Sequence, residues 1–476
     1  MYRLTASAVA AALLATGCCP AAANASGPGL AWQSCTGDPV LPGMECATVD
    51  VPADWDAPRA RTLTLDIARL PQLGSGRSLG TVLLVPGGPG NSGRAELVEK
   101  GASYAGLRQR FQIVSFVPRG VAASRNPLPC SDGTMEKKVP LVLPADEAAF
   151  DKVVADHTAY ATRCRQADPV LFDHVDSRTV ARDMEAIRVA LGEERLNLHG
   201  LSYGGVPASA YLSLFPRRVR AMGTDGAVPH VEHLPDLIYE GLEAQFGRFD
   251  QWCQQTTSCR HHGQDLDQVW TDLMRKANAE PIPVSRYSGV KWNGDQLVMN
   301  SLSALRGFKW VELDAAIEGA RGGDATGFDF GKSATATTSV FRPVQCGDFP
   351  GFDSYAQYTE QLERDRDTYP HVGGHRIAHQ LICSGWPTPN PPTSIVPNRL
   401  PPTLNTGSTV EWQRADEFTH QLPGSRTLYY DGPGHVLYGL GKKCVIEHFD
   451  RYFTQLTLPP AGTHCPEEKA PTAAAG

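Results

Sequence analysis

The chain of 476 residues has no excess of basic side chains: 44 Lys and Arg stand against 51 Asp and Glu, and the formal net charge is −7. The basic residues are scattered, which argues against a nucleic acid or an anionic membrane surface as a partner. Beyond the N-terminus no apolar run is long enough to cross a bilayer, so we expect no stable membrane insertion. The sequence also has no internal repeat and no Cys-x-x-Cys, and we predict neither a metal nor a cofactor.

The N-terminus has the pattern of an export signal. Arg3 provides a weak positive region, residues 8–14 are apolar, and Ala23-Asn24-Ala25 matches a cleavage site. We therefore predict a signal peptide over residues 1–25 and a secreted, extracellular and monomeric protein. Residues 15–18 resemble a lipoprotein cleavage box with Ala where Leu is usual, which leaves a lipid anchor at Cys18 open.

Cysteine is the second indication of export. Of 12 cysteines, Cys18 and Cys19 lie in the signal segment, and the even number that remains is typical of disulfides in an exported protein. Spacing does not determine their connectivity. Pairing of neighbours along the chain is one arrangement compatible with it, namely Cys35–Cys46, Cys130–Cys164, Cys253–Cys259, Cys346–Cys383 and Cys444–Cys465.

The most informative segment surrounds Ser202. The apolar run 196–199 leads into Gly200-Leu201-Ser202-Tyr203-Gly204-Gly205, and small residues follow. A Gly-x-Ser-x-Gly turn between a strand and a helix holds its serine in a strained conformation, with the hydroxyl clear of the sheet. The pattern predicts a nucleophilic serine, although a short motif of this kind also occurs as an ordinary helix cap.

Two further loops support the nucleophile. The apolar run 81–85 ends in a glycine-rich loop, residues 86–93, so the backbones of Gly87, Gly88 and Tyr203 are predicted to hold an oxyanion. The strand-like run 426–430 leads into Asp431-Gly432-Pro433-Gly434-His435, where a general base belongs in the chain order Ser, acid, His. The alternative for His435 is a surface histidine in a turn.

Alternation of strands and helices predicts an α/β fold with a doubly wound, mostly parallel sheet. Short strand patterns before Leu70 predict an antiparallel edge, and the sequence from 228 becomes helical. We divide the chain into core segments 26–227 and 338–465, with a helical cap at 228–337 over the ends of the strands, where such folds bind ligands. Residues 466–476 are predicted to be a disordered tail.

Taken together, these segments resemble the secreted tripeptidyl-aminopeptidase and proline-iminopeptidase branch of the α/β-hydrolases. The resemblance covers nearly the whole mature chain and implies an α/β-hydrolase fold and a serine exopeptidase that acts on free peptide N-termini. The matching segments are 86–93, 116–121 with Ser124 and Cys130, 179–183, 200–205, Tyr211 with 215–216, 225–226, 252–253, 344–348, Cys383 with 385–387, and 431–435.

The chain departs from the family pattern at three places. Val117 stands where the family usually has Asp, and Ala122 stands where it has a second glycine. The loop that normally carries the acid of the triad, after Pro-Pro-x-Leu at 401–404, is shortened and has no aspartate. Because loss of the acid can cost about 10⁴-fold in rate, a weakened or inactive enzyme is a second prediction.

Three carboxylates are candidates for the missing acid. Glu411 lies nearest to the expected place, Asp431 lies four residues before His435, and Asp348 follows a strand-like run at 342–345. Each also has a structural interpretation: Glu411 as a helix-start residue, Asp431 as a turn residue and Asp348 as a loop contact. We favour Glu411.

The resemblance further implies that acidic residues near the cap bind the substrate's ammonium group. Glu232, Asp236 and Glu240 are the candidates for peptide substrates, and Glu243 continues the same helical face, which is also the pattern of a solvated surface. Two other functions remain open: an exported esterase or amide hydrolase with the same triad, and a non-catalytic binding protein that has kept the fold.

Overall fold

The computed structural model describes residues 30–37, 40–130, 143–228, 239–330, 340–387 and 400–468. The predicted signal peptide with Cys18, the candidates Glu232 and Asp236, and residues 469–476 of the predicted tail lie outside the described residues. Among those described, no helix combines the length and the apolar character that a membrane span needs.

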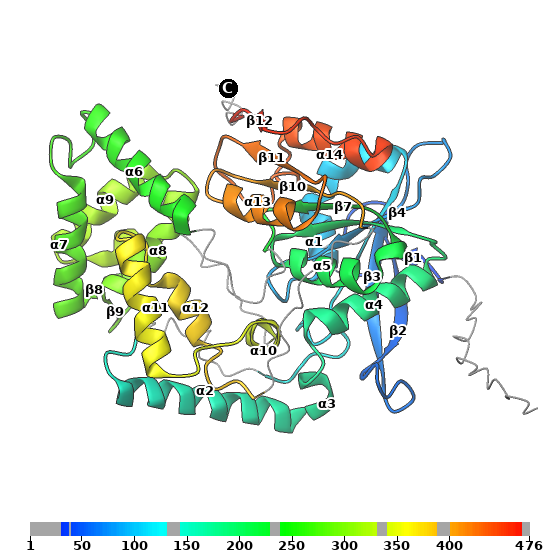
Figure 1. The fold of residues 1–476 in the computed structure, drawn as a ribbon, viewed down its shortest axis with the longest axis horizontal. Helices are drawn as coiled ribbons and strands as arrows, with labels where there is room; N and C mark the ends of the chain where they lie inside the picture. The colour runs from blue at the N-terminus through cyan, green and yellow to red at the C-terminus, as the bar shows by residue number, and fades with distance from the viewer. Residues whose placement is uncertain are drawn as a thin grey trace, which may run out of the picture.

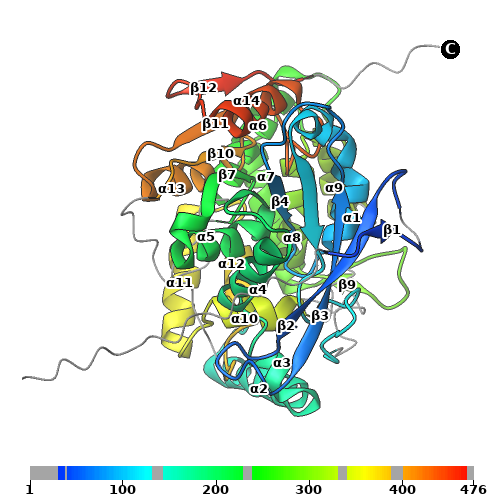
Figure 2. The same cartoon turned by 90° about the vertical axis from the view of Figure 1, so that its right-hand side faces the viewer.

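A sheet of ten strands crosses one lobe of the molecule in the order β1-β2-β3-β5-β4-β6-β7-β10-β11-β12 (Figures 1 and 2). The strands are β1 (Gln33–Ser34), β2 (Glu45–Pro52), β3 (Thr62–Leu70), β4 (Thr81–Val85), β5 (Gln112–Phe116), β6 (Leu196–Leu201), β7 (Val219–Asp225), β10 (Leu404–Gly407), β11 (Arg426–Tyr430) and β12 (Thr463–Cys465). Strands β1, β2, β3 and β5 pair antiparallel, and every pairing from β5 onward is parallel. The predicted antiparallel edge and doubly wound parallel sheet are confirmed.

Helices cover both faces of the sheet. On one face α4 (Ser177–Ala190), α5 (Gly205–Leu214) and α13 (Trp412–Gln421) share an apolar cluster with the strands. On the other, α1 (Gly93–Lys100) and α14 (Lys443–Gln455) do the same. Strands β4 and β6 are buried along their whole length because both of their faces are covered. Parallel strands end at the same edge, so the loops that follow β4, β6, β10 and β11 come together there.

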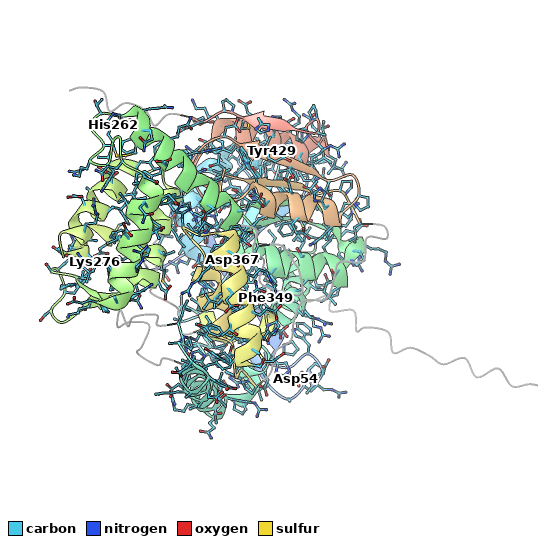
Figure 3. All side chains as sticks on the ribbon, turned by 60° about the vertical axis from the view of Figure 1, so that its left-hand side comes forward. Asp54, His262, Lys276, Phe349, Asp367 and Tyr429 are labelled. Atoms are coloured by element: carbon cyan, nitrogen blue, oxygen red, sulfur yellow. A yellow bond between two sulfur atoms is a disulfide. The ribbon has the colours of Figure 1, made fainter. Side chains whose placement is uncertain are left out.

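The second lobe is helical (Figure 1). Helices α6 (Tyr239–Gln255), α7 (Leu266–Ala279), α8 (Gly294–Arg306) and α9 (Trp310–Arg321) pack around an apolar cluster that includes Trp270. A short antiparallel pair, β8 (Ile282–Pro283) with β9 (Lys291–Trp292), belongs to the same lobe. We call residues 239–330 the cap; Figure 3 labels His262 and Lys276 in it and Tyr429 in the core.

Helical structure continues beyond residue 337, where we had placed the return to the core. Helix α10 (Phe341–Asp348) lies between the lobes (Figure 1). Helices α11 (Tyr355–Thr368) and α12 (His375–Leu381) form a further apolar cluster with α2 (Glu147–Ala167), which follows the lower edge of Figure 1. Helix α3 (Pro169–Phe172) comes after α2 in the chain. The prediction of a strand at 342–345 is wrong, because a short apolar run does not distinguish a buried strand from a buried helix.

Candidate active site

Ser202 lies on the turn between β6 and α5, in the predicted strand-turn-helix arrangement. Its φ is +51°, which non-glycine residues adopt rarely. The neighbouring glycines allow this turn, because a Cβ on Gly204 would lie 2.2 Å from the carbonyl oxygen of Val85. The turn therefore presses against the end of β4 and leaves the Ser202 side chain partly exposed.

His435 lies on the loop after β11, and its Nε2 is 2.9 Å from Ser202 Oγ. The next residue, Val436, has a φ of +60°, a strained conformation for a β-branched side chain. Buried Asp225, at the end of β7, holds this loop: its two carboxylate oxygens accept the N–H groups of Leu437 and Tyr438, both at 2.8 Å. Burial raises the pKa of Asp225 to about 7. The sheet thus fixes the imidazole through the main chain.

Glu411 completes a chain of hydrogen bonds. It follows β10 at the N-cap of α13, is 0% exposed, and places Oε1 2.6 Å from Nδ1 of His435. Its other oxygen accepts from the Ser408 hydroxyl at 3.1 Å. Burial alone would raise the pKa of Glu411, but the charge and hydrogen bond of His435, with Arg306 and Arg414 nearby, lower it to about 2. Glu411 is therefore ionised at neutral pH.

The other two acid candidates have different partners. Asp431 bonds His464 Nδ1 at 2.6 Å. Asp348 accepts from the backbone and hydroxyl of Ser177 and from the Tyr203 hydroxyl, at 2.8, 2.6 and 2.7 Å. Of the three carboxylates, Glu411 is the one that meets His435, and Asp348 instead holds the side chain of Tyr203.

The glycine loop after β4 reaches the serine. A Cβ on Gly87 would lie 3.0 Å from Ser202 Cβ and 3.5 Å from the backbone nitrogen of Tyr203, so only a glycine fits there without displacement. Gly88 follows with a φ of +109°. The parallel pairing of Val85 with Gly200 explains why the two loops lie side by side. Gly87 and Tyr203 thus lie together beside Ser202, and their role with Gly88 in binding an oxyanion stays a prediction.

Of the three residues predicted to bind the substrate's ammonium group, only Glu240 lies among the described residues. Glu240 lies in the first turn of α6 with an exposed side chain. Glu243 on the same helix bonds the ring and backbone nitrogen of His371. The ammonium-binding role of Glu240 stays a prediction.

All five predicted cysteine pairs are present: Cys35–Cys46, Cys130–Cys164, Cys253–Cys259, Cys346–Cys383 and Cys444–Cys465. Two of them lie beside other ligand-type side chains, Cys444 and Cys465 near His448, and Cys253 and Cys259 near Asp314. The sulfurs of these four cysteines form disulfides, whereas a metal is bound by a free thiolate.

Sequence reasoning missed several residues around the triad. Asp225 and Gly226 belong to a segment that matched the family, but their contacts were not foreseen; a Cβ on Gly226 would lie 2.8 Å from His435 Nδ1. Ser408, Arg306 and Arg414 carried no motif at all. These residues surround the triad because the ends of β7 and β10 and the cap helix α8 lie near it in the fold.

Comparison with known proteins finds relatives along nearly the whole chain. A tripeptidyl aminopeptidase of Streptomyces lividans is 26% identical, across 92% of this chain and 87% of its own. Serine protease Hip1 of Mycobacterium tuberculosis is 27% identical, across 89% of this chain and 87% of its own. Carboxylesterase B of Mycobacterium tuberculosis is also 27% identical, across 92% and 90%. The family model of the alpha/beta hydrolase fold matches residues 80–441, and the chain belongs to that family.

Proposed function

We propose that this protein is an exported serine hydrolase that releases short peptides or single residues from free peptide N-termini. The observation that carries the proposal is the continuous chain of hydrogen bonds from Ser202 through His435 to Glu411. The relatives named tripeptidyl aminopeptidase and serine protease support peptides as substrates. The disulfides support export, because such bonds persist in oxidising compartments.

The mechanism follows from the three side chains. His435 takes the proton of the Ser202 hydroxyl as its oxygen attacks the substrate carbonyl, and later gives it to the leaving amine. Glu411 holds the imidazole in the tautomer that presents Nε2 to the serine and stabilises the imidazolium. The backbone N–H groups of Gly87, Gly88 and Tyr203 bind the oxyanion. An acyl-enzyme on Ser202 forms and is then hydrolysed.

Glu411 also bears on the rate that we expect. The shortened acid loop predicted weak activity, but the carboxylate of Glu411 reaches His435 from the N-cap of α13. We therefore propose that glutamate replaces the usual aspartate and that turnover is not limited by a missing acid.

Covalent labelling tests the nucleophile. A fluorophosphonate should label the folded protein, and Ser202→Ala should abolish the label. Absence of labelling in folded wild-type protein would support a non-catalytic binding protein instead.

Substrate class needs a second experiment. A tripeptide anilide with a free amine should be hydrolysed, and acylation of that amine should abolish the reaction. The relative named carboxylesterase B favours one alternative, an esterase. Equal rates on the free and acylated anilides, or turnover confined to simple esters, would favour it over the aminopeptidase.

A further inference from the structure

Two arginines beside the triad make no ion pair. Arg306 is the last residue of α8 in the cap, and Arg414 lies in the first turn of α13, three residues after Glu411. The Nε atoms of both are buried without a hydrogen-bond partner. No ion pair or hydrogen bond of either guanidinium occurs within the described part of the chain. Buried polar groups are usually satisfied, so these two lack something that would satisfy them.

Packing brings the helices that carry these two arginines to one seam between the lobes. Helix α6 packs against both α8 and α13, and α8 also packs against α12. Just before Glu411, Gln245 of α6 donates to Thr409 Oγ1 at 3.2 Å. In the same segment, a Cβ on Gly241 would lie 2.6 Å from the carbonyl oxygen of Val410. The seam therefore runs alongside the carboxylate that orients His435.

Electrostatics agree with this placement. Both arginines lower the pKa of Glu411. The pKa of Arg414 is lowered mainly by its burial and also by the charge of Arg306. Burial together with the same two charges lowers the pKa of His379, on α12, to about 4. Two guanidinium groups and one histidine thus lie within electrostatic reach of one another around Glu411.

Neither guanidinium is bonded to a carboxylate of the described residues. Glu411, the carboxylate that acts on Arg414, already accepts from His435 and Ser408. Arg414 is also unfavourably placed for α13, because the N-terminal end of a helix repels cations. Such an arrangement costs stability in the free protein, and a bound anion would recover that cost.

We propose that Arg306 and Arg414 form a subsite for a carboxylate of the substrate, either an acidic side chain or the C-terminal carboxylate of a short peptide. This inference rests on the proposed peptidase function and adds a substrate class to it. The planar, forked donors of arginine match a carboxylate with two parallel hydrogen bonds. If the arginines only kept Glu411 ionised, their loss would slow every substrate to the same extent.

The test compares matched substrates. Free-amine tripeptide anilides carrying Glu or Gln at each position in turn probe an acidic side chain, and tetrapeptides ending in a carboxylate or an amide probe the C-terminus. We expect one series to show a kcat/KM ratio of about 10- to 100-fold in favour of the carboxylate. Arg306→Gln and Arg414→Gln should each bring that ratio close to one, and Arg306→Lys should retain part of it.

Arg321→Gln is the matched control, since Arg321 ends the neighbouring cap helix and pairs with Glu318 at the surface. It should leave the ratio unchanged. Wild-type protein without preference in either series, or variants that lose activity equally on both members of a pair, would overturn the subsite. Turnover of the neutral anilides reports separately on the peptidase function. Calorimetric binding of the same peptides to Ser202→Ala should show the same ratio, which tests the subsite even without turnover.

Discussion

The core and the cap hold their functional groups by different means. In the core, the main chain does the positioning: Ser202 sits on a strained turn, and Asp225 fixes the His435 loop through two backbone N–H groups. In the cap, side chains bond one another: buried Asp314 accepts from the ring of His261 at 2.7 Å and from the guanidinium of Arg260 at 3.0 Å. Groups that must meet within tenths of an ångström come from the core, whereas in our proposal the cap adds the charge of Arg306, which helps to select a substrate.

Glu411→Gln should have the largest effect, because the amide does not enforce the imidazole tautomer that presents Nε2 to Ser202. We expect kcat to fall about 10⁴-fold. Steady-state kinetics on the best anilide measure it, and fluorophosphonate labelling of the variant reports whether Ser202 stays accessible. A loss below about 10-fold would show that another group orients His435.

Two glycines with positive φ allow the effect of backbone strain to be separated from the effect of a steric clash at the active site. Gly226, with a φ of +56°, faces His435 in the core, whereas Gly289, at +75° in the cap, would place its Cβ in open space. Both alanine variants should lose about 1 kcal/mol of unfolding free energy. Only Gly226→Ala should also lose about 100-fold in kcat/KM, because it pushes His435 away from Glu411. Equal kinetic effects would contradict the contrast between core and cap.

Two buried aspartates make a second matched pair. Asp225→Ala and Asp314→Ala each leave buried hydrogen-bond donors unsatisfied, at about 1–3 kcal/mol for each donor. Chemical denaturation should show similar losses for the two. Activity under native conditions should fall by about 10-fold for Asp225→Ala alone, because the loop that carries His435 is released. An equal fall for Asp314→Ala would mean that the cap also shapes the triad.

The smallest effect is a dependence of cap stability on pH. His371 lies between Glu243 of α6 and Asp267 of α7, with its ring stacked on Phe246 at 3.8 Å. Burial lowers the pKa of His371, but the two carboxylates outweigh it and the net direction is upward. The stability that the protonated His371 adds is therefore fully present below the ordinary histidine pKa of about 6.5. It is lost as the pH rises through the raised pKa of His371.

Wild-type Tm should consequently fall more between about pH 6 and about pH 9 than the Tm of His371→Gln. His464→Gln, which removes an exposed pair with Asp431 in the core, is the control and should leave the pH dependence unchanged. Parallel Tm profiles for wild type and His371→Gln would disprove the contribution.

Local patterns predicted the core better than the seam between core and cap. The strands at 81–85 and 426–430 were predicted with the observed bounds, because buried apolar runs next to glycine loops are distinctive. Position along the chain pointed to Glu411. Arg306 and Arg414 were missed because they are 108 residues apart by number and nothing local indicates that α6 packs against both α8 and α13. The helix at 341–348 was missed because a run of that length has no distinctive period.

The disulfides have a consequence for how the two lobes relate. The longest loop that any of them closes spans 37 residues, and the one within the cap, Cys253–Cys259, spans 6. Among the described residues no disulfide joins 239–330 to the rest of the chain. Disulfide formation therefore stiffens each lobe internally, and the orientation of the lobes depends on packing and on the connecting polypeptide. A reductant would loosen each lobe, whereas the two lobes can move apart without the loss of any disulfide among the described residues.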